Sequence, residues 1–544
     1  MPILSISMLS RLGVAARGDR KTASALGART VRAAAAAHSS NFAVPRRSAS
    51  AGGVLDPQSN KHLLSEFVGV RGPVAQETTW KKRPLFRRKE NQNENNTDDG
   101  FFRTGAEAAD MLYAEAERHD PHEQIFLDTA RDVLDALAPV IDRWPKYAWV
   151  AKHLLEPERG LSFRVAWLDD KGVSRVNRGY RYQYSSALGP FVGPLHFTKE
   201  LTSADVKAHA FDLVLSNSLS GLKVGASVGG ADFNPHDKSE AEIQRFCQAF
   251  MSAMTRHIGT EIDFPSMGAN VGGVEIGYLY GQYKRMSLDA APIGTGLMWG
   301  GAVPHPECAG YGAILFAEKA LRGTGDSLTG KRCVITGSGK VALYAAEKLL
   351  QLGAIPLTFS DSSGHVFEPA GFDDEKFRKI VKIKEERGAR VGRYIVASST
   401  ATYNEPKSIF DAPCDVIVLC AKPNELTEAG AEALAASGCK TVVDGGYRPV
   451  SSAAAKVLKD KGIFHIPYRG TMIGAAIGGG REILRNPLGP GETMNARLEK
   501  KMDEVYEVSA SIAREFNMQG DLERGCLIAG FLRVGRAMMA HGAI

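Results

Sequence analysis

The sequence predicts an α/β protein with two folded domains. Three observations support this prediction. Strand-like apolar runs alternate with amphipathic helical segments from Phe126 onward, a short strand opens into a glycine turn and a helix at 328–352, and residues 494–544 have a helical pattern. The chain has 544 residues, 44% of them hydrophobic and 24% charged, which is enough to bury more than one core.

The N-terminal segment 1–55 has the composition of a mitochondrial transit peptide. It carries one acid, Asp19, against eight Arg and Lys residues, and it is rich in Ala and Ser. We therefore expect import into the mitochondrial matrix, although a plastid address has the same composition and a disordered tail is the plainer alternative. Residues 56–120 follow as a polar linker whose basic run at 81–89 we interpret as solvated rather than as a docking arm.

The overall composition points away from several classes of protein. No apolar run approaches the roughly 20 residues that cross a bilayer, so we expect no membrane span. The net charge of +6 is small for this length and does not indicate a nucleic-acid partner. The seven cysteines are scattered and odd in number, as expected for free thiols, and Cys414 and Cys420 lack a His partner at zinc-site spacing, so we expect no metal.

The first folded domain is assigned to residues 121–315. Apolar residues recur every three or four positions from Phe126 to Leu137, which predicts a helix. Strands are predicted at 163–167 and 180–184, with a turn at 170–172, and a long helix is predicted at 238–257. Mixed strands and helices indicate an α/β domain.

The second domain, at 316–490, begins with the βαβ pattern of a dinucleotide-binding fold. The apolar strand 328–336 opens into a glycine turn and the helix 343–352, and the strand 355–359 ends in a polar Ser-Asp-Ser-Ser segment. The glycines allow a pyrophosphate to approach, and the helix N-terminus supplies amide donors. The candidate cofactor-binding residues here are Gly337, Ser338, Gly339, Lys340, Val341, Asp361 and Ser362. The spacing alone leaves NAD and NADP both open, and further strands are predicted at 416–420 and 441–444.

From about Phe126 to Ile544 the chain resembles the NADP-type hexameric glutamate dehydrogenases. The similar stretches include 176–180, 187–190, 245–248, 275–278, 310–312, 360–364, 424–426 and 528–531. The resemblance implies an oligomer whose first domain builds the substrate site, a Rossmann-like second domain, and C-terminal helices at 491–544 that pack back on the first domain. It also implies NADP rather than NAD, with Asn424 near the nicotinamide.

The departures from that family fall on the residues that carry its chemistry. The catalytic lysine is replaced by Val228, and the aspartate that transfers a proton is replaced by Gly268. The groups that bind the two substrate carboxylates are replaced by Val192, Ser216 and Gly479. Burying a carboxylate without a cation costs several kcal/mol, and losing the acid/base group removes about 100- to 10,000-fold in rate. Lys223, five residues before Val228, would need a rearranged loop to act in its place.

A change of amino-acid specificity does not account for these replacements. The related leucine, valine and phenylalanine dehydrogenases also lack the side-chain-binding lysine, but they keep the groups that Ser216, Val228 and Gly268 replace. The positions near the nicotinamide are changed as well, to Ala309, Pro423 and Tyr447. The phosphate-binding turn therefore matches the family, whereas the positions near the nicotinamide differ from it.

We expect a mitochondrial protein that has lost amino-acid dehydrogenase activity and is a structural subunit of a homo-oligomer or of a larger assembly. Two alternatives remain open: an NAD(P)-dependent oxidoreductase with a less anionic substrate, and an NADP(H)-binding sensor. Arg469, Arg481 and Arg485 lie in the segment that lines the family's cleft. We interpret them as a solvated face, with a new anionic ligand as the alternative.

Overall fold

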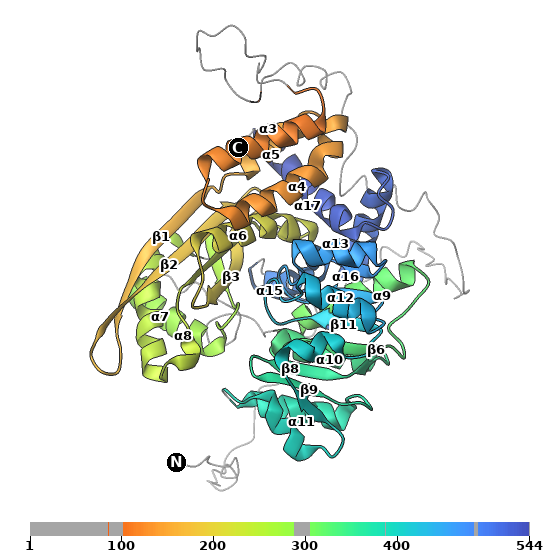
Figure 1. The fold of residues 1–544 in the computed structure, drawn as a ribbon. Helices are drawn as coiled ribbons and strands as arrows, with labels where there is room; N and C mark the ends of the chain where they lie inside the picture. Colours follow the sequence, from red (N-terminus) through yellow and green to blue (C-terminus); the bar gives the residue numbers. More distant parts are fainter. Residues whose placement is uncertain are drawn as a thin grey trace, which may run out of the picture. The chain divides into compact units, whose positions relative to one another are not determined.

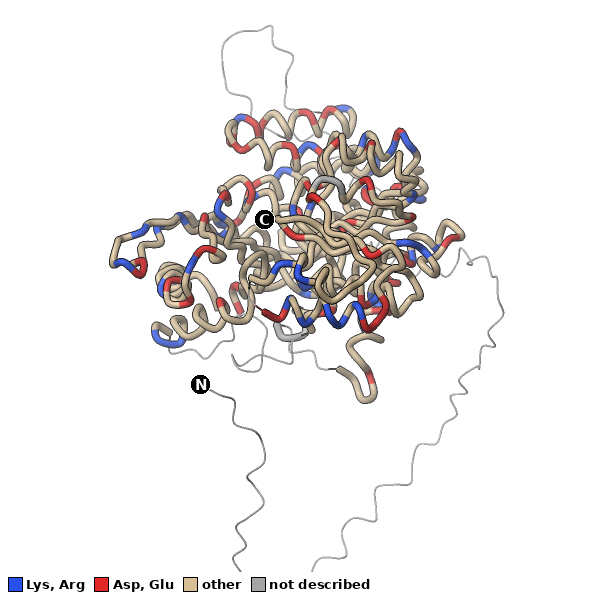
Figure 2. Tube along the Cα trace, turned by 60° about the horizontal axis from the view of Figure 1, so that its bottom comes forward, with Lys and Arg blue, Asp and Glu red and all other residues tan. Residues whose placement is uncertain are grey.

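The structure is a computed structural model that describes Leu85 and residues 102–259, 261–287, 305–386, 388–483 and 488–542, except for the side chains of 407, 408 and 480–483. The predicted targeting segment 1–55 lies outside these residues, as does Arg485. Within the described part no helix is long and apolar enough to cross a membrane. Acidic and basic positions are interspersed along the described trace (Figure 2).

Among the described residues, three helices precede the first sheet: α3 (Gly105–His119), α4 (Gln124–Arg143) and α5 (Tyr147–Leu154). Helix α3 lies inside the range 56–120 that the sequence assigns to a linker, so this part of the linker prediction is wrong. The helix buries Ala108, Leu112 and Ala116 at helical spacing, and Thr104 caps its N-terminus. Alanines make up most of this narrow apolar face, which is why the pattern is weak in the sequence.

The first sheet has five strands in the order β1-β2-β4-β3-β5. The strands are β1 (Arg159–Leu168), β2 (Ser174–Ser185), β3 (Phe191–Phe197), β4 (Ala226–Ala231) and β5 (Asp263–Ser266). The predicted hairpin of β1 and β2 is confirmed, with Gly172 at a φ of 75° in its turn. Strand β3 is parallel to both β4 and β5.

Helices cover the two faces of this sheet (Figure 1). One face packs on α6 (Ser203–Leu219), and the other on α7 (Glu240–Met254) and α8 (Gly273–Met286). Buried residues alternate with half-exposed ones along β3, so Leu195 packs with α7 while Val192 and His196 point to the α6 side. The α6 face therefore holds the positions whose family chemistry is replaced.

The second domain contains a parallel sheet in the order β13-β12-β11-β6-β7, which confirms the predicted dinucleotide-binding pattern. Its strands are β6 (Arg332–Ile335), β7 (Ile355–Pro356), β11 (Val416–Leu419), β12 (Thr441–Asp444) and β13 (Phe464–Ile466). The predicted strand 355–359 is divided into two strands, although Leu357 N still donates to Cys333 O of β6 at 2.8 Å. The chain then pairs in a separate antiparallel sheet of β8 (Thr358–Asp361), β9 (Gly364–Phe367) and β10 (Thr402–Asn404).

The helices of the second domain begin with α9 (Glu307–Gly323), so the predicted boundary between residues 315 and 316 falls inside a helix and is wrong. Two glycines near this boundary, Gly310 and Gly312, allow α9 to pack closely against its neighbours. A Cβ at Gly312 would lie 2.6 Å from Gly474 Cα. The other helices are α10 (Lys340–Gln351), α11 (Asp374–Glu385), α12 (Glu428–Ala436), α13 (Ser452–Asp460), α14 (Tyr468–Thr471) and α15 (Ile473–Ile483).

Two long helices end the chain, α16 (Met494–Glu515) and α17 (Leu522–His541). Helix α17 packs directly on α6 of the first domain. A Cβ at Gly530 would lie 2.3 Å from Leu215 O, and Ser218 Oγ donates a hydrogen bond to Gly530 O at 2.7 Å. This close approach requires glycine at position 530 and fixes α6, the helix that carries much of the candidate site.

Candidate active site

Val228, at the position of the family's catalytic lysine, is a core residue. It lies on β4 opposite Tyr182 of β2, and its side chain is fully buried. It belongs to the same apolar cluster as Phe211 and Leu215 of α6. Lys223, the one nearby lysine that the sequence offers as a replacement, is exposed at the turn before β4. Val228 is therefore buried in the core, whereas Lys223 is exposed to solvent.

Gly268, at the position of the family's proton-transfer aspartate, has no room for a side chain. A Cβ there would lie 2.3 Å from Leu195 O and 2.9 Å from His196 Nδ1. The His196 ring is held in this place because its Nδ1 accepts a hydrogen bond from the Ala269 amide at 2.9 Å. Any residue larger than glycine requires a shift of the backbone.

The three carboxylate-binding positions are occupied by small or apolar residues. Val192 is half-buried on β3, and Ser216 is 7% exposed on α6. The neighbouring Asn217 joins these two elements, because its side-chain amide donates to Val192 O at 3.4 Å and to Gly225 O at 2.7 Å. Gly479 lies on α15, which contacts α6, and a Cβ there would meet nothing within 4 Å. None of the three supplies a cation.

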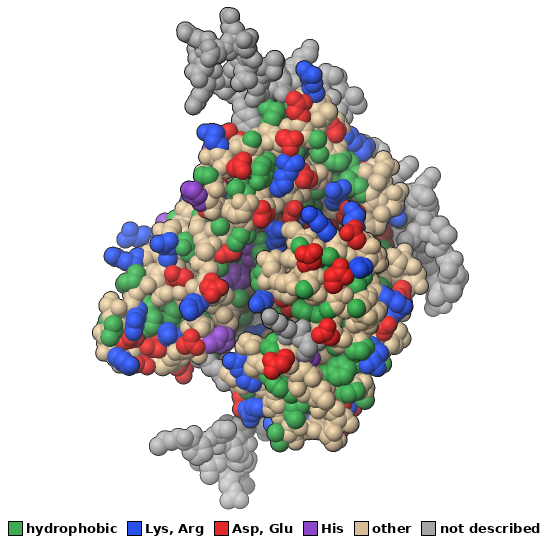
Figure 3. Space-filling view, viewed as in Figure 1, with side chains coloured by type: hydrophobic (Ala, Val, Ile, Leu, Met, Phe, Trp, Pro, Cys, Tyr) green, Lys and Arg blue, Asp and Glu red, His purple; other side chains and the backbone are tan. Residues whose placement is uncertain are grey.

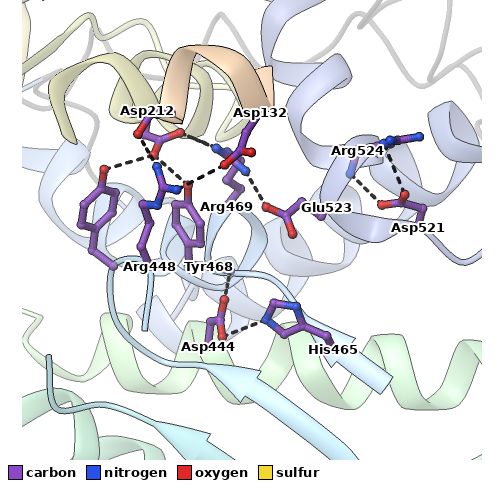
Figure 4. Close-up of polar contacts among 12 residues, drawn as sticks. Asp132, Asp212, Asp444, Arg448, His465, Tyr468, Arg469, Asp521, Glu523 and Arg524 are labelled. Carbon is purple, nitrogen blue, oxygen red and sulfur yellow. Dashed lines mark hydrogen bonds and ion pairs between the residues drawn. The ribbon is translucent and has the colours of Figure 1, made fainter. Parts of the chain in front are cut away.

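A buried carboxylate on α6, Asp212, collects hydrogen bonds from three side chains of the second domain (Figure 4). Its Oδ2 accepts from the hydroxyls of Tyr447 at 3.1 Å and Tyr468 at 2.7 Å. Its Oδ1 accepts from Arg469 Nη2 at 2.6 Å and Nε at 3.1 Å. We call Asp212, Tyr447, Tyr468 and Arg469 the Asp212 cluster. It joins α6 of the first domain to the nucleotide-binding domain.

Arg469 is 2% exposed, so the prediction that it belongs to a solvated face is wrong. Its partner Asp212 is distant in the sequence, and Arg469 also donates to Glu523 Oε1 of α17 at 2.6 Å. Neighbouring Arg448 reaches α4, where it donates to Thr129 Oγ1 and to Asp132 Oδ2, the latter at 3.2 Å. The side chains of Arg481 and Arg485 lie outside the described residues.

The cluster is held in its charged form. Burial raises the pKa of Asp212, but the charges of Arg469 and Arg448 and the Tyr468 hydroxyl outweigh burial and lower the pKa overall. The same cluster raises the pKa of Arg448 and Arg469 despite their burial. A buried ion pair with further hydrogen bonds on each partner has little tendency to exchange its partners for a ligand.

Tyr447, at a family position near the nicotinamide, stacks on a histidine of α6. The rings of Tyr447 and His209 are 3.8 Å apart at 15°, and His209 stacks in turn on His196 at 5.2 Å and 23°. The pKa of His209 is lowered to about 3 and that of His196 to about 4, chiefly by burial. Both imidazoles are therefore neutral at pH 7. No sequence pattern marks this stack, because its three members come from separate elements.

The glycine turn of the second domain keeps the geometry that a pyrophosphate needs. Gly337 has a φ of 81°, and a Cβ there would lie 3.0 Å from Cys420 O. Its amide donates to Ser360 Oγ at 2.6 Å, which ties the turn to β8. Gly339 is the N-cap of α10 without a side-chain cap, and a Cβ there would meet nothing within 4 Å. The helix N-terminus is thus open for an anion, and Lys340 and Val341 follow in its first turn.

A cation that was not predicted from the sequence, Arg390, lies beside the end of β8. Arg390 Nη1 donates to Ser362 Oγ at 2.7 Å and lies 4.0 Å from Asp361. Asp361 itself accepts hydrogen bonds from Ser363 and from the Val391 amide. An arginine at this place accommodates the 2′-phosphate of NADP, so the residues present fit NADP. Arg390 follows Ser362 by 28 residues, and only the fold brings them together.

The opposite side of the turn is formed by the loop after β11. Asn424 has a φ of 51° and is exposed, and its amide donates to Arg448 O at 2.8 Å. Glu425 accepts from Thr336 Oγ1 and from the Ala421 amide, both at 3.0 Å. Burial raises the pKa of Glu425 to about 7. This loop therefore connects the nucleotide turn to the Asp212 cluster through Arg448.

Comparisons with known proteins agree with this architecture. Residues 157–285 match the model of the Glu/Leu/Phe/Val dehydrogenase dimerisation domain, and residues 300–542 match that of Glutamate/Leucine/Phenylalanine/Valine dehydrogenase. The chain is 40% identical over 443 residues to an NADP-specific glutamate dehydrogenase of Chlorella sorokiniana, which covers 80% of this chain and 84% of the relative.

Solved structures show the same similarity. The glutamate dehydrogenase of Plasmodium falciparum is 36% identical and has a TM-score of 0.77, covering 82% of this chain and 97% of that one. A hetero-hexameric glutamate dehydrogenase from Thermus thermophilus is 21% identical with a TM-score of 0.64, covering 72% of this chain and 91% of that one, and shows the fold alone.

Proposed function

The chain belongs to the Glu/Leu/Phe/Val dehydrogenase family, and on that premise we propose that it has lost amino-acid dehydrogenase activity, binds NADP(H), and is a structural subunit of an oligomer or of a larger mitochondrial assembly. Its relatives are NADP-specific glutamate dehydrogenases.

The observation that carries the proposal is the absence of room for the reaction's acid/base group at Gly268. A Cβ at that position would lie 2.3 Å from Leu195 O. The other essential position, Val228, is packed in the core, so neither a lysine nor a water that it would polarise has a place there. Without both groups, the two side chains that carry protons in the family's reaction are missing from their positions.

The Asp212 cluster supports the same conclusion. In an active member of the family the substrate's charges need cations in the cleft. Here Arg469 and Arg448 are already paired with Asp212 and Asp132. A glutamate carboxylate would have to displace a buried ion pair, which is costly.

Nucleotide binding is retained in this proposal. Gly337 and Gly339 shape the pyrophosphate site, and Ser362 and Arg390 form the site for a 2′-phosphate. When bound, NADPH supplies a hydride donor, but no residue described in the cleft completes a proton transfer beside it. The bound nucleotide then stabilises the second domain.

The direct test is an assay of the purified protein with glutamate and NADP⁺, and with 2-oxoglutarate, ammonia and NADPH. We expect no turnover above a sample without protein, together with a rise in thermal midpoint on adding NADPH. Turnover of either substrate at an ordinary enzyme rate overturns the proposed loss of activity. A control with an active relative at equal concentration sets the detection limit.

Oligomeric state and location require a second experiment. Gentle affinity purification from mitochondria, followed by sizing of the native complex, separates a free homo-oligomer from a component of a larger assembly. The sequence resemblance to the hexameric glutamate dehydrogenases supports an oligomer, and the composition of residues 1–55 supports the mitochondrial matrix. Recovery of the protein from another compartment contradicts this part of the proposal.

The intact phosphate turn favours one alternative, an NADP(H)-binding sensor that has no assembly role. It predicts NADPH binding by a free oligomer, without turnover and without co-purifying partners. The other alternative, an oxidoreductase with a less anionic substrate, predicts NADPH consumption with an uncharged or monovalent oxo compound.

A further inference from the structure

Two cysteines of the nucleotide-binding domain, Cys414 and Cys439, come just before neighbouring parallel strands. Val416 of β11 pairs with Thr441 of β12, and each cysteine lies two residues before one of these positions. Neighbouring strands are about 4.8 Å apart, which is within the Cα separation of about 4.4–6.8 Å that a disulfide requires. The strand register therefore brings the two cysteines to a separation that a disulfide bridges.

The side chains of these two cysteines lie on the same side of the sheet. Both belong to the apolar cluster that contains Leu434 of α12. The Cys414 thiol donates a hydrogen bond to the Cys439 sulfur. Cys439 Sγ also lies 3.8 Å from the carbonyl oxygen of Asp415, the residue that follows Cys414. The two sulfurs are thus in contact without any change in the fold.

A third cysteine of this region, Cys333 on β6, packs on the other face of the sheet. Its side chain belongs to the cluster of Val416 and Val418, which is separate from the cluster of Cys414 and Cys439. Among the described residues no group of three His, Cys, Asp or Glu side chains is placed to hold a metal. The arrangement is therefore a pair of thiols.

The two thiols of the pair differ in how readily they ionise. The contact with Cys414 lowers the pKa of Cys439; burial opposes this effect, and the backbone amides of Thr441 and Ile417 lower the pKa further. The same contact raises the pKa of Cys414. Because a thiolate is the nucleophile in thiol oxidation, Cys439 is the sulfur that attacks an oxidant and Cys414 is the sulfur that follows.

Both cysteines of the pair are partly accessible from the surface. Cys414 is 6% exposed and Cys439 is 5% exposed, whereas Cys333 is fully buried. Such small openings admit a reagent of the size of hydrogen peroxide and exclude a large ligand. On the face of the molecule drawn in Figure 3, apolar side chains lie in small groups among charged ones, so a small polar oxidant meets no continuous apolar surface there.

We propose that Cys414 and Cys439 are a site of reversible oxidative modification, at which hydrogen peroxide forms a disulfide between β11 and β12. The Cys439 thiolate attacks one peroxide oxygen, the O–O bond breaks, and the products are a sulfenic acid at Cys439 and hydroxide. The Cys414 sulfur then attacks the Cys439 sulfur, the S–O bond breaks and water leaves. In total the two thiols lose two protons and two electrons, and the peroxide is reduced to two waters. This inference is independent of the proposed loss of dehydrogenase activity.

The test treats the full-length, folded protein with hydrogen peroxide, blocks the remaining thiols with N-ethylmaleimide and maps the peptides by tandem mass spectrometry. Digestion with Asp-N and Glu-C separates the cysteines of this segment, because Asp415 directly follows Cys414 and Glu425 lies between Cys420 and Cys439. We expect a pair of peptides linked through Cys414 and Cys439, which dithiothreitol releases. A link to any other cysteine, a sulfinic acid at Cys439 without a link, or unmodified thiols overturns the proposal.

Three variants test the assignment of the two sulfurs. Cys414→Ala and Cys439→Ala each remove one of them, so each should lower the yield of the linked peptides at least about tenfold. Cys414→Ala should also leave a sulfenic acid at Cys439 that dimedone traps, which a purely structural effect of the substitution does not produce.

Cys333→Ala, which removes the third thiol of the region, is the matched control and should leave the link unchanged. Loss of the link in this variant contradicts the assigned pair. Circular dichroism confirms that each variant is folded, and the peptide map of the protein without substitutions decides the question if a variant does not fold.

Discussion

Asp212 Oδ1 lies 2.6 Å from Arg469 Nη2, and this contact joins residues that are 257 positions apart in the chain. Asp212 comes from α6, which covers one face of the first sheet, and Arg469 comes from α14, which follows the last strand of the parallel sheet. Both side chains are at most 3% exposed. The two domains are therefore joined by a buried, fully charged pair.

Removing the carboxylate of this pair should destabilise the protein strongly. Asp212→Ala leaves Arg469 buried opposite two tyrosine hydroxyls, and breaking a buried pair on one side costs about 3–5 kcal/mol. Urea unfolding at pH 7 measures the change. Glu432→Ala, which breaks the half-exposed pair with Lys461, is the control and should cost no more than about 1 kcal/mol. Equal effects of the two variants contradict the assigned role of Asp212.

Restoring the catalytic lysine alone should harm the fold and give no activity. Val228→Lys places an ammonium in an apolar cluster, which we expect to cost at least about 2 kcal/mol at pH 7. The buried lysine has a lower pKa than in the unfolded chain, so the unfolded state binds more protons and the cost shrinks as the pH rises from 7 toward 10. Urea unfolding at both pH values checks this. Val396→Lys, at a side chain 95% exposed, should show neither effect.

The choice between NADPH and NADH should depend on Arg390. Arg390→Ala removes the cation beside Ser362, and losing a charge-assisted hydrogen bond to a phosphate weakens NADPH by about 10- to 100-fold while NADH is unchanged. Calorimetric titration with each nucleotide measures both affinities. Arg393→Ala, which removes an exposed arginine paired with Glu386, is the control. A similar loss of both nucleotides would show that Arg390 acts on the fold and not on the 2′-phosphate.

Acid should destabilise the protein through the stacked histidines. The pKa of His209 in the folded state is about 3, below the unfolded value of about 6.5, so between these values the unfolded chain binds more protons. Stability is then complete above pH 6.5 and falls as the pH is lowered. His209→Phe should flatten the slope of unfolding free energy between pH 7 and pH 5. An unchanged slope would mean that His209 is solvated and charged in the folded protein.

The parts of the fold that depend on local pattern could be predicted from the sequence. Apolar runs on both sides of a glycine turn predict the β1–β2 hairpin. The Gly337 turn is predicted by its position between a strand and a helix. The replaced positions Val228 and Gly268 could be located because they lie in well-matched segments. Only the structure shows that Val228 is a core residue and that Gly268 has no room for a side chain.

The side-chain contacts that join the two domains could not be predicted in this way. A single arginine such as Arg469 looks the same in sequence whether it is solvated or buried, and the difference is decided by Asp212 far along the chain. The His196, His209 and Tyr447 stack likewise draws one ring from a strand, one from a helix and one from a loop. Helix α3 was missed because alanines bury little area and give a faint period.

The packing around Gly268 also limits what a single substitution can do there. An aspartate introduced at position 268 meets Leu195 O and the His196 ring before it reaches any substrate. Strand β3 and the histidine therefore have to move before such a side chain fits. Placing an acidic group here requires coordinated changes in β3 and at His196, and one exchange of residue 268 is not sufficient.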